Sequence, residues 1–207
     1  MAFDVPHLPS DEIHIWRMPW PATVPGRSAF DQLLSAYASS DAPAPIRGMH
    51  GKPMLPAPWN TLGFNGSHSG PLALFAIGRG AEGFELGVDV EHLRPRPRAL
   101  ELARRFFAPV EADWLASVDE DARLRAFLDV WTLKEAVLKA HGGGLSYGLH
   151  RVTFQPRDDD WRPLAFEGEI APASAWQFRR LDVGAGYVAA VAWRGAERRV
   201  RVFTTAI

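Results

Sequence analysis

The sequence predicts an α+β fold. Helical periodicity is found mainly in the middle of the chain, and runs with the composition of β-strands lie on both sides of it. Strands and helices do not alternate in the regular order of a doubly wound parallel sheet. With 207 residues, 47% of them hydrophobic, the chain is long enough for one large domain or two small ones around a real core.

Helices are expected in four places. A short helix at residues 28–38 is followed by a loop through residues 42–60. Three more helices are expected farther along, at residues 99–107, 109–117 and 121–141. The last should end at Gly142, Gly143 and Gly144, because glycine readily adopts the left-handed conformation that closes helices.

Strands are expected before and after these helices. The apolar run LALFAI at residues 72–77 is typical of a buried strand, and FELGVDVE at residues 84–91 should be its hairpin partner across GRGAEG. Four more strands, the last two resembling a hairpin, are expected at residues 151–155, 176–181, 187–193 and 198–204.

The segment HLRPRPR at residues 92–98 alternates arginine with proline and is expected to form an extended connector. Linkers of this composition commonly separate compact units. The chain is therefore expected to consist of two halves, residues 1–93 and 94–207.

Charge and cysteine content exclude several classes of protein. A formal net charge of -1 provides no overall field to attract nucleic acid or a membrane surface, so neither is expected as a partner. Because cysteine is absent, any metal must be held by histidine or carboxylates. The first 20 residues contain no apolar run resembling a signal peptide or a membrane span, which favours a cytoplasmic location. A monomer is expected.

Arginine supplies 20 of the 23 basic residues, and the lysines are Lys52, Lys134 and Lys139. A lysine ammonium is a compact, rotatable point charge, which suits contact with phosphate oxygens or a leaving group. Chance is the alternative explanation. The three lysines are therefore treated as candidate functional residues, to be compared with motifs found independently.

Asp89 and Glu91 are expected on the same face of a strand, because they are two residues apart in GVDVE. At about 7 Å along the strand, with an effective dielectric of about 20, two such charges repel by roughly 2 kcal/mol. On an exposed sheet face, solvent would screen this repulsion. This strand is strongly apolar, which favours partial burial and a bound cation.

A third carboxylate, Glu135, is expected on the core side of the long helix, four residues after Trp131 of an apolar stripe. Because burial of an ionised carboxylate costs several kcal/mol, Glu135 should be protonated, paired or bound to metal. An ion pair with Lys139 at i,i+4 is the alternative, and is worth only a few tenths of a kcal/mol.

Three carboxylates form an oxygen-only ligand set that suits Mg²⁺, or Mn²⁺ in its place. Mg²⁺ usually completes its shell with water and substrate phosphates, which implies a substrate that carries a diphosphate. The chain has neither a Walker A loop nor a GxGxxG after a strand, which disfavours the ordinary ATP and NAD folds.

Four stretches resemble the surfactin-type (Sfp-type) 4′-phosphopantetheinyl transferases in composition, order and spacing: GKP at 51–53, FNGSHSG at 64–70, GVDVE at 87–91 and WTLKEAVLKAHGGGL at 131–145. LARRFFAPVE at 102–111 resembles the segment that this family carries between the last two. The resemblance implies a pseudo-twofold arrangement of two similar α/β halves. The active site and coenzyme A would lie in the cleft between them.

The resemblance also implies roles for single residues. The magnesium ion would be held by Asp89, Glu91 and Glu135, and the catalytic residues would be Glu135 and Lys139. Coenzyme A would be bound by Arg27, by Lys52, by Ser67 and His68 in a loop formed by FNGSHSG, and by Lys134 and Lys139. Relatives usually have a longer first half with an Arg-rich helix, so contacts to the 3′-phosphate would fall mainly to Lys52 and His68.

The reaction implied is transfer of 4′-phosphopantetheine from coenzyme A to a serine of an apo acyl or peptidyl carrier protein, with release of 3′,5′-ADP. The alternatives are a magnesium-dependent hydrolase of the diphosphate, or a catalytically silent module that binds coenzyme A or a carrier protein. The intact DxE and KExxxK patterns argue against a silent module. The absence of a further candidate for positioning water argues against the hydrolase.

Overall fold

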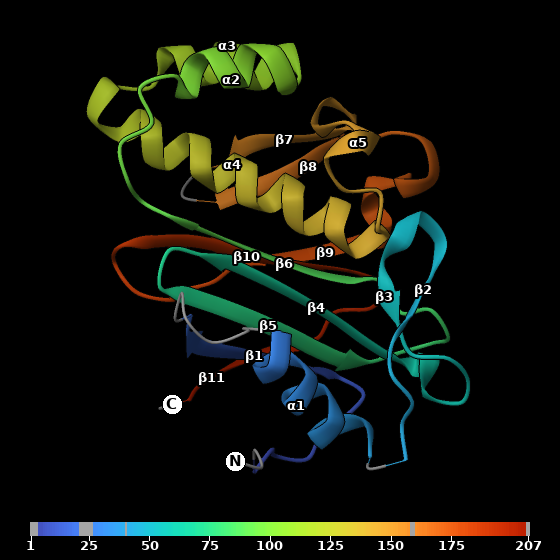
Figure 1. Cartoon of the computed structure of the whole chain (residues 1–207). Coiled ribbons are helices and arrows are strands. Elements are labelled where there is room, and N and C mark those ends of the chain that lie inside the picture. Colours follow the sequence, from blue (N-terminus) through green and yellow to red (C-terminus); the bar gives the residue numbers. More distant parts are fainter. Residues whose placement is uncertain (1–3, 21–26, 40, 158–159, 206–207) are drawn as a thin grey trace.

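The computed structural model describes residues 4–20, 27–39, 41–157 and 160–205, and has two sheets stacked face to face between helices (Figure 1). One sheet has the strand order β11-β1-β5-β4, with β1 at Glu12–Pro19, β4 at Leu62–Ser69, β5 at Leu72–Arg79 and β11 at Arg199–Thr204. The other has the order β6-β10-β9, with β6 at Leu86–His92, β9 at Trp176–Arg180 and β10 at Tyr187–Arg194. The predicted α+β class is confirmed.

Helices cover both outer faces of this pair of sheets (Figure 1). Helix α4, Glu120–His141, lies on β6 and β10, with α2 (Ala99–Phe106) and α3 (Pro109–Ser117) on top of it. Helix α1, Arg27–Ala38, covers the four-stranded sheet. Smaller elements complete the described fold: β2 (Ile46–Arg47) with β3 (Pro53–Met54), β7 (Val152–Arg157) with β8 (Asp160–Phe166), and α5 (Gly144–Tyr147).

The core forms three layers because the central strands bury both of their faces. In β5, Leu74 and Ala76 pack between the two sheets, whereas Phe75 and Ile77 pack beneath α1. A third cluster lies between α4 and the outer face of the three-stranded sheet. Helix α4 is therefore buried around most of its circumference from Phe127 onward, as expected for a helix between two packed layers.

Both hairpins expected from the sequence are wrong. Strand β5 pairs with β1 and β4, whereas β6 pairs with β10, so the turn GRGAEG connects one sheet to the other. Strand β11 pairs in parallel with β1 rather than with β10. The apolar run of β5 is buried on both faces, so it shows no alternation of apolar and polar residues, and nothing within it indicates which strands it pairs with.

Five strands were not expected: β1, β4, β8 and the two-residue strands β2 and β3, which lie in the segment 42–60 expected to be a loop. The helix predictions agree with α1 to α4 to within one or two residues. The division at residue 93 and the pseudo-twofold relation remain predictions. Strand pairing crosses that boundary twice, since β6 pairs with β10 and β1 with β11.

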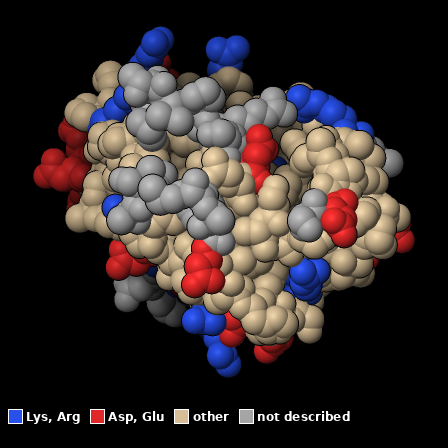
Figure 2. All heavy atoms as spheres, turned by 60° about the horizontal axis from the view of Figure 1, so that its bottom comes forward, with Lys and Arg blue, Asp and Glu red and all other residues tan. Residues whose placement is uncertain are grey.

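Basic and acidic residues are scattered among uncharged ones over the face shown in Figure 2. This distribution agrees with the net charge of -1. In the part of the chain that the structure describes, no helix has both the length and the apolar character needed to cross a bilayer.

Candidate active site

The site is built on β6, whose residues alternate between two environments. Leu86, Val88 and Val90 pack between the sheets, so the intervening residues Gly87, Asp89 and Glu91 face α4. Strand β6 packs against α4, which carries Glu135 and Lys139. The predicted carboxylates therefore meet where a strand and a helix cross.

Gly87 allows this close crossing. A Cβ atom at position 87 would lie 2.1 Å from the carbonyl oxygen of Ala136 and 2.4 Å from the backbone nitrogen of Ala140. Any side chain there would force the helix away from the strand. The glycine of GVDVE thus brings Glu135 and Lys139 next to Asp89.

Asp89 is held by two groups from different elements. Its Oδ1 accepts hydrogen bonds from Lys139 Nζ at 2.8 Å and from Ser67 Oγ at 2.9 Å, and Lys139 also donates to Ser67 at 2.9 Å. Asp89 is 5% exposed, and its second oxygen, Oδ2, is buried with no hydrogen-bond partner among the described residues. Lys139 thus pairs with Asp89 rather than with Glu135, the alternative considered from the sequence.

Glu135 is the most strongly perturbed acid of the site. It is 7% exposed, and its Oε1 is buried without a partner among the described residues. Burial, followed by the negative charge of Asp89, raises the pKa of Glu135 to about 7, while Lys139 opposes the rise. A carboxylate in this state is poised to exchange a proton near neutral pH or to bind a cation.

Glu91 lies toward the more exposed end of β6. Its Oε2 accepts hydrogen bonds from Arg96 at 2.5 Å and from Ser69 at 3.2 Å. Burial and the charge of Asp89 raise the pKa of Glu91, and Arg96 opposes this. Arg96 belongs to the segment expected to be only a connector, so the sequence analysis missed its contact with the site.

The FNGSHSG motif forms strand β4 and not a loop, which corrects the sequence interpretation. Alternate residues reach across to β6: Asn65 Oδ1 accepts from Val88 N at 3.0 Å, Ser67 donates to Asp89, and Ser69 donates to Glu91. Because β4 and β6 belong to different sheets, these side chains take the place of a backbone ladder. The spacing of two in NxSxS was the available signal, but glycine and serine made the segment resemble a loop.

The three predicted metal ligands are neighbours but are not gathered on one point. Among the described residues, the set of three His, Asp or Glu side chains whose ligand atoms all lie within 4.8 Å is a different one, His50, His141 and Glu169. Asp89 and Glu91 are instead neutralised by Lys139 and Arg96. The unpartnered oxygens of Asp89 and Glu135 remain, and an oxygen-only donor set of this kind fits magnesium.

Two of the predicted coenzyme A ligands lie in structural positions. Lys52 Nζ donates to the carbonyl oxygens of Leu86 at 2.9 Å and Ala140 at 2.5 Å, so it joins β6 to the end of α4. Burial lowers the pKa of Lys52 to about 8. The other lysine, Lys134, is buried more deeply.

Lys134 is fully buried and is not brought to the carboxylates. Its Nζ pairs with Glu111 at 2.7 Å and donates to the carbonyl oxygens of Leu149, at 2.9 Å, and Val152. Glu111 in turn accepts from the backbone nitrogen of Phe154 at 2.8 Å. This network links α3, α4 and β7, with no exposed surface on the lysine for a ligand.

The remaining predicted ligands lie on the first half. His68 is exposed, and its ring stacks on Trp20 with centroids 4.4 Å apart. It points away from Ser67, because neighbouring residues of a strand face opposite sides. Arg27 begins α1, but its side chain lies outside the described residues.

Comparison with known families shows which family the chain belongs to. The sequence profile of the 4′-phosphopantetheinyl transferase superfamily matches residues 85–192, which include Asp89, Glu91, Glu135 and Lys139. The chain belongs to this superfamily. Its recognition from the sequence motifs is thereby confirmed.

Individual relatives carry the same name. A provisionally named 4′-phosphopantetheinyl transferase of Synechocystis is 46% identical over 110 residues, covering 51% of this chain and 42% of that protein's length. HetI of Nostoc is 29% identical over 225 residues, covering 91% and 90%. Sfp of Bacillus subtilis is 30% identical over 142 residues, covering 69% and 59%. All three are named 4′-phosphopantetheinyl transferases, the activity inferred from the motifs.

Proposed function

We propose that this chain transfers 4′-phosphopantetheine from coenzyme A to a serine of an apo acyl or peptidyl carrier protein and releases 3′,5′-ADP. The observation that carries the proposal is the crossing of β6 and α4, where Asp89 and Glu135 keep unpartnered oxygens beside Lys139. This crossing lies inside the segment that matches the superfamily. Neither hydrolysis nor silent binding has a comparable observation in its favour.

Asp89, Glu91 and Glu135 would hold Mg²⁺ or Mn²⁺. When bound, the ion would supply Lewis-acid neutralisation of the diphosphate of coenzyme A. The chain's own contribution begins with Lys139, which Asp89 and Ser67 hold at the edge of the cluster. There its ammonium can offset the negative charge that grows on the leaving 3′,5′-ADP.

Glu135 is the group that would accept the proton of the attacking serine. In the reaction, the serine Oγ forms a bond to the β-phosphorus, the bond from that phosphorus to the ADP oxygen breaks, and the serine proton passes to Glu135. Without a bound ion, burial raises the pKa of Glu135 to about 7, which makes this carboxylate a better proton acceptor than an exposed glutamate. The same carboxylate could act through a water molecule.

For coenzyme A, we propose direct contacts from Ser67, His68 and Lys139, and from Arg27 at the start of α1. Lys52 and Lys134 would act by anchoring α4 to the elements around it, since carbonyl oxygens and Glu111 already occupy their ammonium groups. Nucleotide recognition would then depend less on lysine than the motifs alone imply.

The decisive experiment is mass spectrometry of an apo carrier protein after incubation with coenzyme A, Mg²⁺ and this chain. The carrier should gain the mass of one phosphopantetheine group at its serine, and excess chelator should prevent the gain. The conservative variant Glu135→Gln should be inactive while still folded. Release of 3′,5′-ADP without modification of any carrier would instead identify a hydrolase, and full transfer in chelator would refute the metal assignment.

A further inference from the structure

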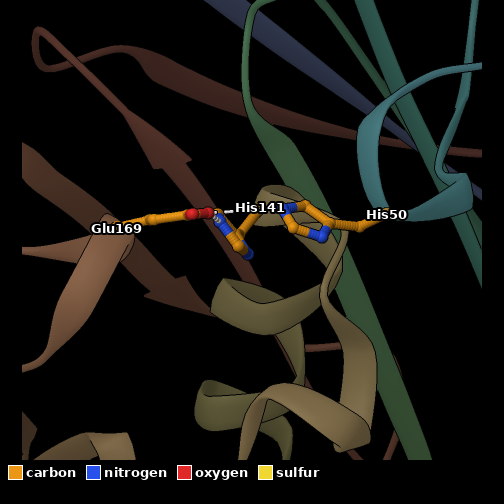
Figure 3. Close-up of side chains that lie close together, drawn as sticks. All are labelled: His50, His141 and Glu169. Atoms are coloured by element: carbon orange, nitrogen blue, oxygen red, sulfur yellow. Dashed lines mark hydrogen bonds and ion pairs between the residues drawn. The ribbon is translucent and has the colours of Figure 1, made fainter.

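His50, His141 and Glu169 form a cluster apart from the carboxylates on β6. They come from three separate segments: the 3-10 turn Met49–Gly51, the last residue of α4, and the 3-10 turn Gly168–Ile170. Figure 3 shows the two imidazole rings side by side, with the carboxylate of Glu169 directed at them. None of these residues was a candidate from the sequence, because their separation hides their proximity.

The spacing of the three ligand atoms fits a metal ion. Glu169 Oε2 lies 3.0 Å from His141 Nε2 and 3.3 Å from His50 Nε2, and all three ligand atoms lie within 4.8 Å of one another. Metal-to-ligand distances of about 2.0 to 2.1 Å give tetrahedral edges of about 3.3 Å. The two distances from Glu169 Oε2 to the histidine nitrogens are therefore already close to the length of a tetrahedral edge.

The surrounding structure holds these groups in place. The backbone nitrogen of Glu169 donates to Tyr147 Oη at 2.8 Å, and the ring of Tyr147 packs edge-on against His141, with centroids 4.7 Å apart. His50 has a φ of 59°, a left-handed conformation that few non-glycine residues adopt and that histidine tolerates better than most. The side chain of His141 is 6% exposed, whereas those of His50 and Glu169 are 33% and 63% exposed.

The cluster borders a cavity of about 380 Å³, which Lys52, Met54 and Arg194 also line. A metal ion held by three protein ligands on such a rim keeps its fourth position open to water. A small metal could therefore enter without unfolding the chain.

We infer that His50, His141 and Glu169 form a binding site for a divalent transition metal of the zinc class. Two imidazole nitrogens and one carboxylate are the ligands of such metals, whereas Mg²⁺ prefers oxygen ligands alone. The site is therefore chemically distinct from the carboxylates proposed for Mg²⁺. It would exist whether or not the chain transfers phosphopantetheine.

The affinity should be moderate. Zinc-bound imidazoles usually donate their second ring nitrogen to an acceptor, but Nδ1 of His141 is buried with no partner among the described residues. The high exposure of Glu169 also leaves that ligand in competition with water. Binding in the micromolar range follows, weaker than in dedicated structural zinc sites.

A bound ion would connect distant parts of the chain. His141 ends the helix that carries Glu135 and Lys139, while His50 and Glu169 belong to turns far away in sequence. Cross-linking these segments stabilises the folded state by mass action, because the unfolded chain does not hold the three ligands together. The ion would therefore fix the carboxyl end of α4 rather than take part in chemistry.

The test is calorimetric titration of Zn²⁺ into the full chain at pH 7.5, with excess Mg²⁺ present so that oxygen-only sites are occupied. One Zn²⁺ per chain should bind and raise the midpoint of thermal unfolding. Co²⁺ used in its place should give the visible absorption of a four-coordinate ion. His50→Ala and Glu169→Gln change exposed side chains and should each weaken Zn²⁺ binding at least about tenfold.

His150→Ala is the matched control, because it removes an exposed histidine elsewhere and should bind Zn²⁺ like the wild type. Asp89→Asn should also bind Zn²⁺ normally. The inference is wrong if the wild type binds Zn²⁺ no more tightly than about 1 mM. It is equally wrong if Asp89→Asn abolishes binding while His50→Ala and Glu169→Gln leave it intact.

Discussion

Removing the charge of Glu135 should stabilise the metal-free protein at alkaline pH while abolishing transfer. Glu135 has a pKa of about 7 in the folded chain, against an ordinary value of 4.5. At a pH between these two pKa values, the folded state therefore holds the carboxyl proton of Glu135 more tightly than the unfolded state does. Unfolding releases the proton there, so the free energy of unfolding falls as the pH rises.

The size of the effect follows from the same two values. At about 1.4 kcal/mol per pH unit, the ionised form of Glu135 destabilises the metal-free fold by roughly 3 kcal/mol at pH 8. Most of this cost appears between pH 5 and pH 8. Glu135→Gln keeps the shape of the side chain but cannot ionise, so it should be more stable than the wild type at pH 8 by up to that amount, and at pH 5 by less than about 1 kcal/mol.

The assay is urea denaturation followed by tryptophan fluorescence, at pH 5 and pH 8 in the presence of a chelator. Glu101→Gln, which removes an exposed carboxylate from α2, is the control and should change stability by no more than a few tenths of a kcal/mol at either pH. Saturating Mg²⁺ should recover stability in the wild type but less in Glu135→Gln. If Glu135→Gln is no more stable than the wild type at pH 8, or if its gain in stability is equally large at pH 5, ionisation of this buried carboxylate does not destabilise the fold.

Three further variants test the helix–strand crossing, the buried ion pair and the lysine near Glu135. Gly87→Ala should destabilise the fold by about 1 to 3 kcal/mol and reduce transfer, because its Cβ would lie 2.1 Å from a helix carbonyl. Gly186→Ala is the control, since a Cβ at position 186 meets open space, and it should change neither stability nor transfer in the same denaturation and transfer assays. Lys134→Met should lower the free energy of unfolding by about 3 to 5 kcal/mol, because it leaves Glu111 buried without its charged partner. Adding Glu111→Leu should recover much of that loss. A Lys134→Met chain of normal stability would contradict a structural role for Lys134. Lys139→Ala should lower kcat more than it raises KM for coenzyme A, since charge on the leaving group grows in the transition state; a change confined to KM would assign Lys139 to substrate binding alone.

The sequence was informative where structure is local. Helices α2, α3 and α4 were predicted because apolar spacing, Pro109 and the glycines after His141 are signals within a few residues of each element. The strand β1 was missed because EIHIWRMP buries polar and apolar residues alike, so no alternation is visible. Pairing of strands was mispredicted because partners are chosen by the packing of whole layers, which no short window contains.

The site was predictable to a similar extent. Asp89 and Glu135 were singled out because a carboxylate on an apolar strand or helix face demands compensation, and Lys139 because the chain has so few lysines. What the sequence could not provide was the identity of the compensating groups. Lys139 neutralises Asp89 across two elements, and Arg96 neutralises Glu91. Lys52 and Lys134 share a motif or a residue type with the other candidate site residues, yet only the fold revealed that carbonyl oxygens surround their ammonium groups.

The parallel pairing of β11 with β1 has a consequence for folding during synthesis. Glu12 and Arg199 are register partners separated by 187 positions, so one edge of β1 stays unpaired until nearly the whole described chain has been translated. Contacts between such distant residues form slowly, because a long loop must close first. An unpaired edge in a nascent chain is also a template for wrong partners. Arrested translation upstream of residue 199 should therefore leave an aggregation-prone intermediate, and a separately supplied β11 peptide could complete its sheet.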